Sequence, residues 1–115
     1  MPEFTVEDHF SGKSPMVREI YDRVLAAAQR CGPVVEEPKK TSIHLVNSTA
    51  LAGVATRREH LILTIKSDRE LKSRRIHKTE QTSARRFHHE VKLASPADVD
   101  KELIGWLREA FALSA

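Results

Sequence analysis

The sequence lacks the features that most often point to a secreted or membrane protein. It has one cysteine, Cys31, so no disulfide can form within the chain, which fits a reducing compartment. No apolar run approaches the roughly 18 residues of a membrane span. The first ten residues have neither the basic start nor the apolar run of a secretory signal. We therefore expect a cytoplasmic protein that does not bind membranes.

Glycine and aromatic residues are also scarce. The four glycines are isolated from one another, which excludes a Gly-rich phosphate loop. Aromatic residues make up only 5% of the chain. Those at Tyr21, Phe87, Trp106 and Phe111 fall at positions that face a core, which leaves few rings on which a nucleic-acid base could stack.

The usual metal-binding and catalytic patterns are missing too. There is no Cys-x-x-Cys pair and no His-x-x-x-His on a helix, so we predict no metal and no cofactor. Cys31 continues an apolar stripe at a helix C-terminus, where the dipole disfavours a thiolate, which predicts a buried thiol rather than a nucleophile. Glu36, Glu37 and Glu80 form no visible acid–base pair. We predict no catalytic residue.

What is present is a chain of 115 residues, 40% hydrophobic and 30% charged, which is typical of one globular domain spanning residues 1–115. Two segments read as long helices. Ser14 and Pro15 begin the first with a cap followed by proline, and Gly32 and Pro33 end it. Ser95 and Pro96 repeat the cap-then-proline signature, and the last helix is expected from residue 96 to about 113. A single helical turn is expected at residues 5–10, capped by Thr5.

Between the helices, four segments read as strands, at residues 41–46, 50–56, 60–66 and 86–93. The last alternates apolar and polar residues most clearly. The small residues of 50–56 leave room for something bulky on top, for which we expect a helix. The segment 67–85 is expected to be a long loop, with Ile76 as a brief strand at most. A short edge strand is also compatible with the connector at 34–40.

Two helices with wide apolar stripes need one surface to cover. We therefore predict a two-layer α+β fold, with an antiparallel meander of four or more strands covered on one face by the N- and C-terminal helices. This order resembles frataxin-like small domains. The first helix lacks the acidic run of frataxins, so iron binding is not implied.

Several short segments together resemble a known family. They are Phe10-Ser-Gly-Lys-Ser-Pro, Gly32-Pro-Val, Lys39-Lys-Thr-Ser-Ile-His-Leu, Ala52-Gly-Val-Ala-Thr-Arg and Asp100-Lys-Glu-Leu-Ile-Gly-Trp-Leu-Arg-Glu-Ala. They are similar to a bacterial family catalogued as domain of unknown function 5655. The resemblance covers nearly the whole chain and implies a complete domain, but no activity, cofactor or catalytic residue. Family members fused to nuclease-like domains favour a nucleic-acid setting.

Charge is unevenly distributed along the chain. Residues 39–92 carry 13 Lys/Arg against 5 Asp/Glu, a net of +8, while the remainder carries 6 against 11, a net of −5. Dibasic pairs fall at strand ends and in the long loop, where one positive rim could form. The anion-binding candidates are Lys39, Lys40, Arg57, Arg58, Arg74, Arg75, Lys78, Arg85 and Arg86.

The histidines give a second set of candidates. His88 and His89 are adjacent on one predicted strand, so they point to opposite faces and cannot both ligate one ion. His89 lies in the apolar register, which predicts a hydrogen-bonded, partly buried side chain. His44, His60 and His88 are expected to share the open sheet face with Glu90.

Three functions remain open at this point. The first is a non-enzymatic binding domain whose basic loops engage an anionic partner, such as nucleic acid. The second is an interaction module that forms a homo-oligomer through the open sheet face or an edge. The third is an enzyme or small-ligand binder with a pocket between residues 39–44 and the loop 67–85.

Overall fold

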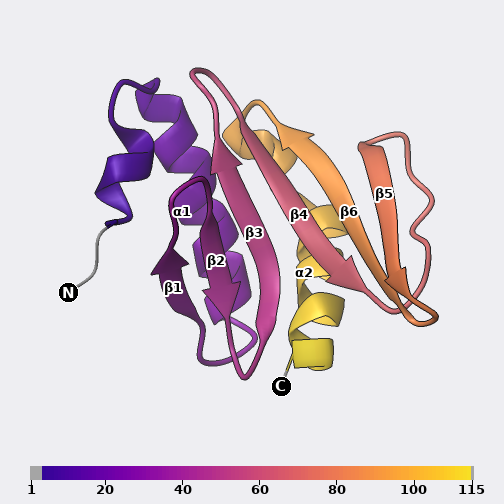
Figure 1. The fold of residues 1–115 in the computed structure, drawn as a ribbon. Coiled ribbons are helices and arrows are strands. Elements are labelled where there is room, and N and C mark those ends of the chain that lie inside the picture. Colours follow the sequence, from indigo (N-terminus) through magenta and orange to yellow (C-terminus); the bar gives the residue numbers. More distant parts are fainter. Residues whose placement is uncertain (1–3, 115) are drawn as a thin grey trace.

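The structure, a computed structural model, describes residues 4–114. Six strands form one antiparallel sheet in the order β1-β2-β3-β4-β6-β5 (Figure 1). In chain order the strands are β1 (Val35–Pro38), β2 (Ile43–Val46), β3 (Ala50–Thr56), β4 (Leu61–Ser67), β5 (Ile76–Ser83) and β6 (Arg86–Leu93). The short edge strand compatible with the connector is present as β1. Residues 60–66, predicted as a strand, correspond to β4, which lies inside the sheet between β3 and β6.

Two helices cover one face of this sheet, as the sequence predicts. They are α1 (Pro15–Gln29) and α2 (Lys101–Ser114), and they lie side by side behind the strands (Figure 1). The Ser14 hydroxyl accepts a hydrogen bond from the backbone of Met16, and Pro15 occupies the first turn of α1. This cap and proline fix where the helix begins. The α+β two-layer prediction is confirmed.

The predicted turn at residues 5–10 is a short 3-10 helix, η1 (Glu7–Phe10). Its cap is reciprocal: the Thr5 hydroxyl accepts from the Asp8 backbone at 3.2 Å, and the Asp8 carboxylate accepts from the Thr5 backbone at 2.9 Å. These two hydrogen bonds satisfy donors that a helix end leaves free.

Two predicted boundaries are wrong. The helix expected from Pro96 is interrupted: η2 (Pro96–Asp98) ends at Val99, whose ψ of 76° is not helical, and α2 starts at Lys101. The Asp100 carboxylate accepts from the Leu103 backbone at 3.1 Å, so it caps a new helix. The second correction concerns residues 67–85, where Ile76–Ser83 are not a loop but the strand β5, joined to β6 by a tight hairpin.

The core lies between the helices and one face of the sheet. Alternate residues of β4, namely Leu61, Leu63 and Ile65, are fully buried there. They meet side chains of the predicted helix stripes, including Val17, Ile20, Val24, Leu103 and Leu107. The opposite face of the sheet carries no helix among the described residues. We call it the open face, and it holds the candidate site.

Candidate binding surface on the open face

The open face is hollowed along β3 because that strand presents almost no side chain there. A register shift after Leu45 makes Leu51 the extra residue of a bulge, so that Leu51, Ala52 and Val54 all turn toward the helices. Gly53 and Ala55 are left on the open side. The room predicted from the small residues of this strand is therefore real, but no helix fills it. The expected helix does pack on β3, but over the face that holds Ala52, so Gly53 and Ala55 are left uncovered.

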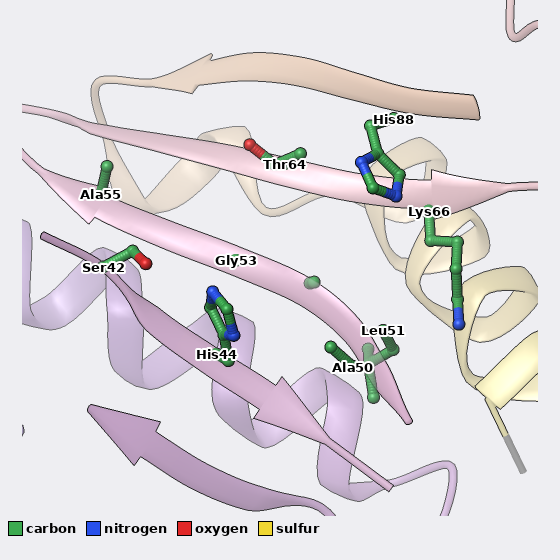
Figure 2. A pocket seen from close by; sticks show the side chains of 10 residues that line it. Ser42, His44, Ala50, Leu51, Gly53, Ala55, Thr64, Lys66 and His88 are labelled. Carbon is green, nitrogen blue, oxygen red and sulfur yellow. The ribbon is translucent and has the colours of Figure 1, made fainter. Parts of the chain in front are cut away.

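The walls of this hollow come from the neighbouring strands. Gly53 lies opposite His44 on β2 and Thr64 on β4, so a bare strand runs between two polar side chains. The hollow has a volume of about 260 Å³. We call it the β3 trough (Figure 2), and it is lined by Ser42, His44, Ala50, Leu51, Ala52, Gly53, Ala55, Thr64, Lys66 and His88.

The polar groups of the trough share one chemical character. Its lining includes an ammonium, two imidazoles and two hydroxyls, and no carboxylate. Lys66 extends along the trough from β4, and its Nζ donates to the Thr49 hydroxyl at 3.0 Å (Figure 2). Burial, followed by repulsion from Arg86, lowers the pKa of Lys66. A bound anion would stabilise the charged form of Lys66, because this ammonium is partly desolvated and lies near a second cation.

His60, before the start of β4, also has cationic neighbours. Burial lowers the pKa of His60, and repulsion from Lys92 and Arg57 lowers it further, while Glu59 opposes the shift. His60 itself lies in the turn before β4 and does not line the trough. Lys92 and Arg57 are thus close to His60, as Arg86 is close to Lys66.

Of the four polar candidates predicted for the open face, only two line the trough. His44 and His88 both line the trough, from β2 and β6. Glu90 is on the open face as expected, opposite Thr64, but it does not line the trough and lies 3.4 Å from His77 Nε2 and 3.8 Å from Lys78 Nζ. The trough residues that sequence reasoning missed are Ser42, Thr64 and Lys66. The available signal was the small side chains of β3.

The nine basic candidates do not form a single rim. Antiparallel pairing places the turns at 39–42 and 57–60 at one end of the sheet and the hairpin at 84–85 at the opposite end. Lys39, Lys40, Arg57 and Arg58 thus belong to one end, and Arg85 and Arg86 to the other. Arg74 and Arg75 precede β5 and Lys78 lies within it. The expectation of one continuous rim fails because strand direction alternates.

Some of these cations also have acidic neighbours. Arg75 Nη1 lies 2.7 Å from Asp100 and 3.2 Å from Glu102, and its other terminal nitrogen donates to the Asp98 carbonyl. Burial alone would lower the pKa of Arg75, but the hydrogen bonds to Asp100 and Glu102 outweigh it and raise the pKa. Arg75 therefore ties the segment before β5 to α2, which removes it from the anion-binding set. Exposed ion pairs add weaker neighbours, Glu37 for Lys39 and Glu90 for Lys78.

The pocket expected between residues 39–44 and the segment 67–85 is wrong. In the sheet, β3, β4 and β6 separate β2 from β5. The part of 67–85 before β5 turns under the sheet instead, where Leu71 is buried. No residue of 67–85 lines the β3 trough.

His89 holds this segment in place. Its Nδ1 lies 3.0 Å from the Thr79 hydroxyl and its Nε2 lies 2.9 Å from the Ser67 hydroxyl. The Leu71 backbone N–H also donates to Nε2, at 3.4 Å. His89 is hydrogen-bonded as predicted, but it is fully rather than partly buried. Because Ser67 is buried as well, this Ser–His pair is closed to a substrate and acts as a structural brace.

The other candidate sites considered from the sequence were a metal site and Cys31. Within residues 4–114, no group of three or more His, Cys, Asp or Glu side chains could hold a metal ion. Cys31 is only partly buried, which corrects the prediction of a core thiol, because it lies in the turn after α1. It lines a groove of about 330 Å³ between the C-terminal end of α1 and one side of α2, and Arg30 and Arg108 are also among the lining residues.

No helix in the described part of the chain is long and apolar enough to cross a membrane.

The fold and the trough define a small α+β domain with one sheet face that carries no helix among the described residues. The chain belongs to the family described as Domain of unknown function (DUF5655), whose family model matches residues 6–114. This confirms the resemblance seen in the sequence. No curated protein matches the chain. No solved structure matches it either.

Proposed function

We propose that this domain is a non-enzymatic binding module that holds an anionic, phosphate-bearing partner, such as a nucleic acid, on its open face. The observation that carries the proposal is the β3 trough, whose polar lining can donate hydrogen bonds and includes no carboxylate. Phosphate contacts need charge and donors within reach rather than a sequence motif. Lys66 and His88 lie opposite one another on β4 and β6, and Arg86 is close enough to lower the pKa of Lys66.

The size of the trough favours a group of a larger partner. Sites for whole small molecules typically enclose about 300–1,000 Å³, whereas the trough offers about 260 Å³. Val35 is the large apolar side chain that the described residues expose, so no aromatic platform supports base stacking. We therefore expect binding through phosphates, with little sequence preference and a strong dependence on salt.

The test uses heparin retention and a gel shift with duplex DNA, each at low and moderate salt. Lys66→Gln and Arg86→Gln should weaken binding, and each should reduce the slope of log affinity against log salt by about one. The matched control is Lys101→Gln, which removes the same charge from α2 on the covered side of the sheet. It should change binding little.

A second variant separates the trough from general surface charge. A Cβ added at Gly53 would meet His44 at an ordinary distance of 3.7 Å, so Gly53→Val can be accommodated and adds a residue that strands favour. Its branched side chain fills the floor of the trough, and binding should fall while thermal stability holds. Failure of the wild type to bind either polyanion at low salt would remove the proposal. Equal losses for Lys66→Gln and Lys101→Gln would move the site away from the trough.

A further inference from the structure

The two edges of the sheet are unequal. β1 is four residues long and ends in Pro38, which has no N–H to donate, so this edge is short and protected. β5 is eight residues long, contains no proline, and every residue after Ile76 is exposed. It pairs only with β6, at the end of the strand order.

Among the described residues, no strand pairs with the outer edge of β5. Within residues 4–114, the backbone hydrogen bond that β5 makes outside the sheet ladder is from Ile76, at its first residue, to the Ser73 carbonyl at 3.2 Å. The segment before β5 is instead tied to the covered side of the molecule. Arg69 binds Glu109 and Arg75 binds Glu102 of α2 there, and Leu71 is buried. The free edge can therefore accept another strand.

The sequence of β5 indicates which strand that is. In an antiparallel pair of two identical strands, residues equally distant from the twofold axis face each other. With the axis at Thr79, Lys78 lies opposite Glu80 of the second copy, and Glu80 lies opposite Lys78 of the second copy. Both side chains are on the same face of the strand, since they are two residues apart. The register thus yields two cross-strand pairs of opposite charge.

The regular part of β5 agrees with this register. Its pairing with β6 is irregular between Ile76 and Lys78 and again between Gln81 and Ser83, and is uninterrupted from Lys78 to Gln81. A second strand would therefore find a straight ladder centred close to Thr79. Bulges at both ends limit how far the ladder extends. The resulting interface is small, below the area of stable complexes, so it belongs to the weak, concentration-dependent class.

We propose that the domain forms a homodimer by antiparallel pairing of β5 with β5 of a second copy, in the register that sets Lys78 against Glu80. The dimer joins two six-stranded sheets into one continuous sheet. Because each copy has one long free edge, the assembly closes at two subunits and does not grow into a fibre. This inference is independent of the anion-binding proposal, since it uses neither the β3 trough nor its cations.

A charge-swap experiment tests both the edge and the register, with sedimentation velocity measured up to millimolar protein. The wild type should show a monomer–dimer equilibrium. Lys78→Glu and Glu80→Lys should each weaken association about tenfold, because each sets two like-charged pairs across the axis. The double variant K78E/E80K should restore wild-type association, since it reverses both pairs. Lys101→Glu, with the same charge change on α2, should leave association unaltered.

Hydrogen exchange supplies an independent readout. The amides of residues 78–81 should exchange more slowly at high protein concentration in the wild type and not in Lys78→Glu. Far-ultraviolet circular dichroism checks that each variant is folded. A wild type that stays monomeric at millimolar concentration overturns the proposal. So does a dimer that both single variants leave intact, or one that the double variant fails to restore.

Discussion

The two faces of the sheet are made by the same strands but differ in what covers them. On the covered face, β2, β3 and β4 contribute Ile43, Val54 and Leu63, all fully buried beneath the helices. On the open face, the same strands contribute His44, Gly53 and Thr64, which lie side by side in one row across the sheet. The covered face holds the fold together, whereas the open face keeps polar groups and an unfilled hollow. Stability and the proposed binding function therefore reside on opposite sides of one layer.

The largest expected effect tests this contrast within β4. Leu63→Ala should lower the free energy of unfolding by about 2–5 kcal/mol, because it removes fully buried methyl groups and leaves a cavity. Thr64→Ala, at the next residue and on the open face, should stay within about 0.5 kcal/mol of the wild type. Urea unfolding followed by the fluorescence of Trp106, the single tryptophan, measures both variants. Similar losses for the two variants would show that the open face is also part of the core.

The contrast also explains how far the sequence could predict the fold. Period-two alternation in β6 and the cap-then-proline signals at Ser14 and Ser95 are local, and they predicted the strand and the starts of both helical segments. The face taken by β3 depends on a bulge after Leu45, which shifts Leu51 toward the helices. Nothing in the residues of β3 alone indicates that bulge. The small residues of β3 are evident in the sequence, but the face on which each one lies is set by the pairing of β3 with β2 and β4.

The strand β5 was missed for a related physical reason. Its residues from His77 to Ser83 are polar on both faces, so they show no apolar alternation. The strand forms because β6 offers a backbone ladder and because the buried His89 receives Thr79. Likewise, the dibasic pairs were visible in the sequence, but their separation to opposite ends of the sheet follows from strand direction. Local sequence patterns thus predict most helices and strands, whereas the positions of side chains in the sheet depend on how the strands pair.

A smaller effect is expected where Gly32, in the turn after α1, approaches Phe111 on α2. A Cβ added at Gly32, whose φ is +153°, would lie 2.6 Å from Cζ of Phe111 on α2. Gly32→Ala should therefore lower the free energy of unfolding by about 1–3 kcal/mol, since either the backbone or the ring must move. Thermal unfolding or urea unfolding measures the change.

Gly105 provides the matched control in the same layer. It lies inside α2, and an added Cβ would meet nothing within 4 Å. Gly105→Ala should raise the free energy of unfolding by about 0.5–1 kcal/mol, because alanine loses less backbone freedom than glycine in a helix. If the two alanine variants shift stability in the same direction, close packing at Gly32 is not the reason for that glycine.

The last prediction concerns the point where the covering layer reaches the edge strand β1. The Tyr21 hydroxyl, from α1, donates to the Glu36 carboxylate at 2.5 Å. Burial, followed by the hydrogen bond and negative charge of Glu36, raises the pKa of Tyr21 well above its ordinary value near 10. Tyr21→Phe should lower the free energy of unfolding at neutral pH by about 1–2 kcal/mol, because it leaves the carboxylate without this donor.

Because the pKa of Tyr21 is raised in the folded chain, the stability that this hydrogen bond contributes should depend on pH in alkaline solution. Below about pH 10 the phenol is protonated in both the folded and the unfolded chain, so its stabilising contribution is fully present. Above that pH the unfolded chain loses the proton first, and the wild type should lose stability relative to Tyr21→Phe as the pH rises. Tyr21 is the single tyrosine, so tyrosinate absorbance reports this residue alone. Absorbance that rises near pH 10 while Trp106 fluorescence stays native would show that α1 does not hold the phenol against Glu36. Absorbance that rises only together with unfolding would show that the covered layer extends to β1.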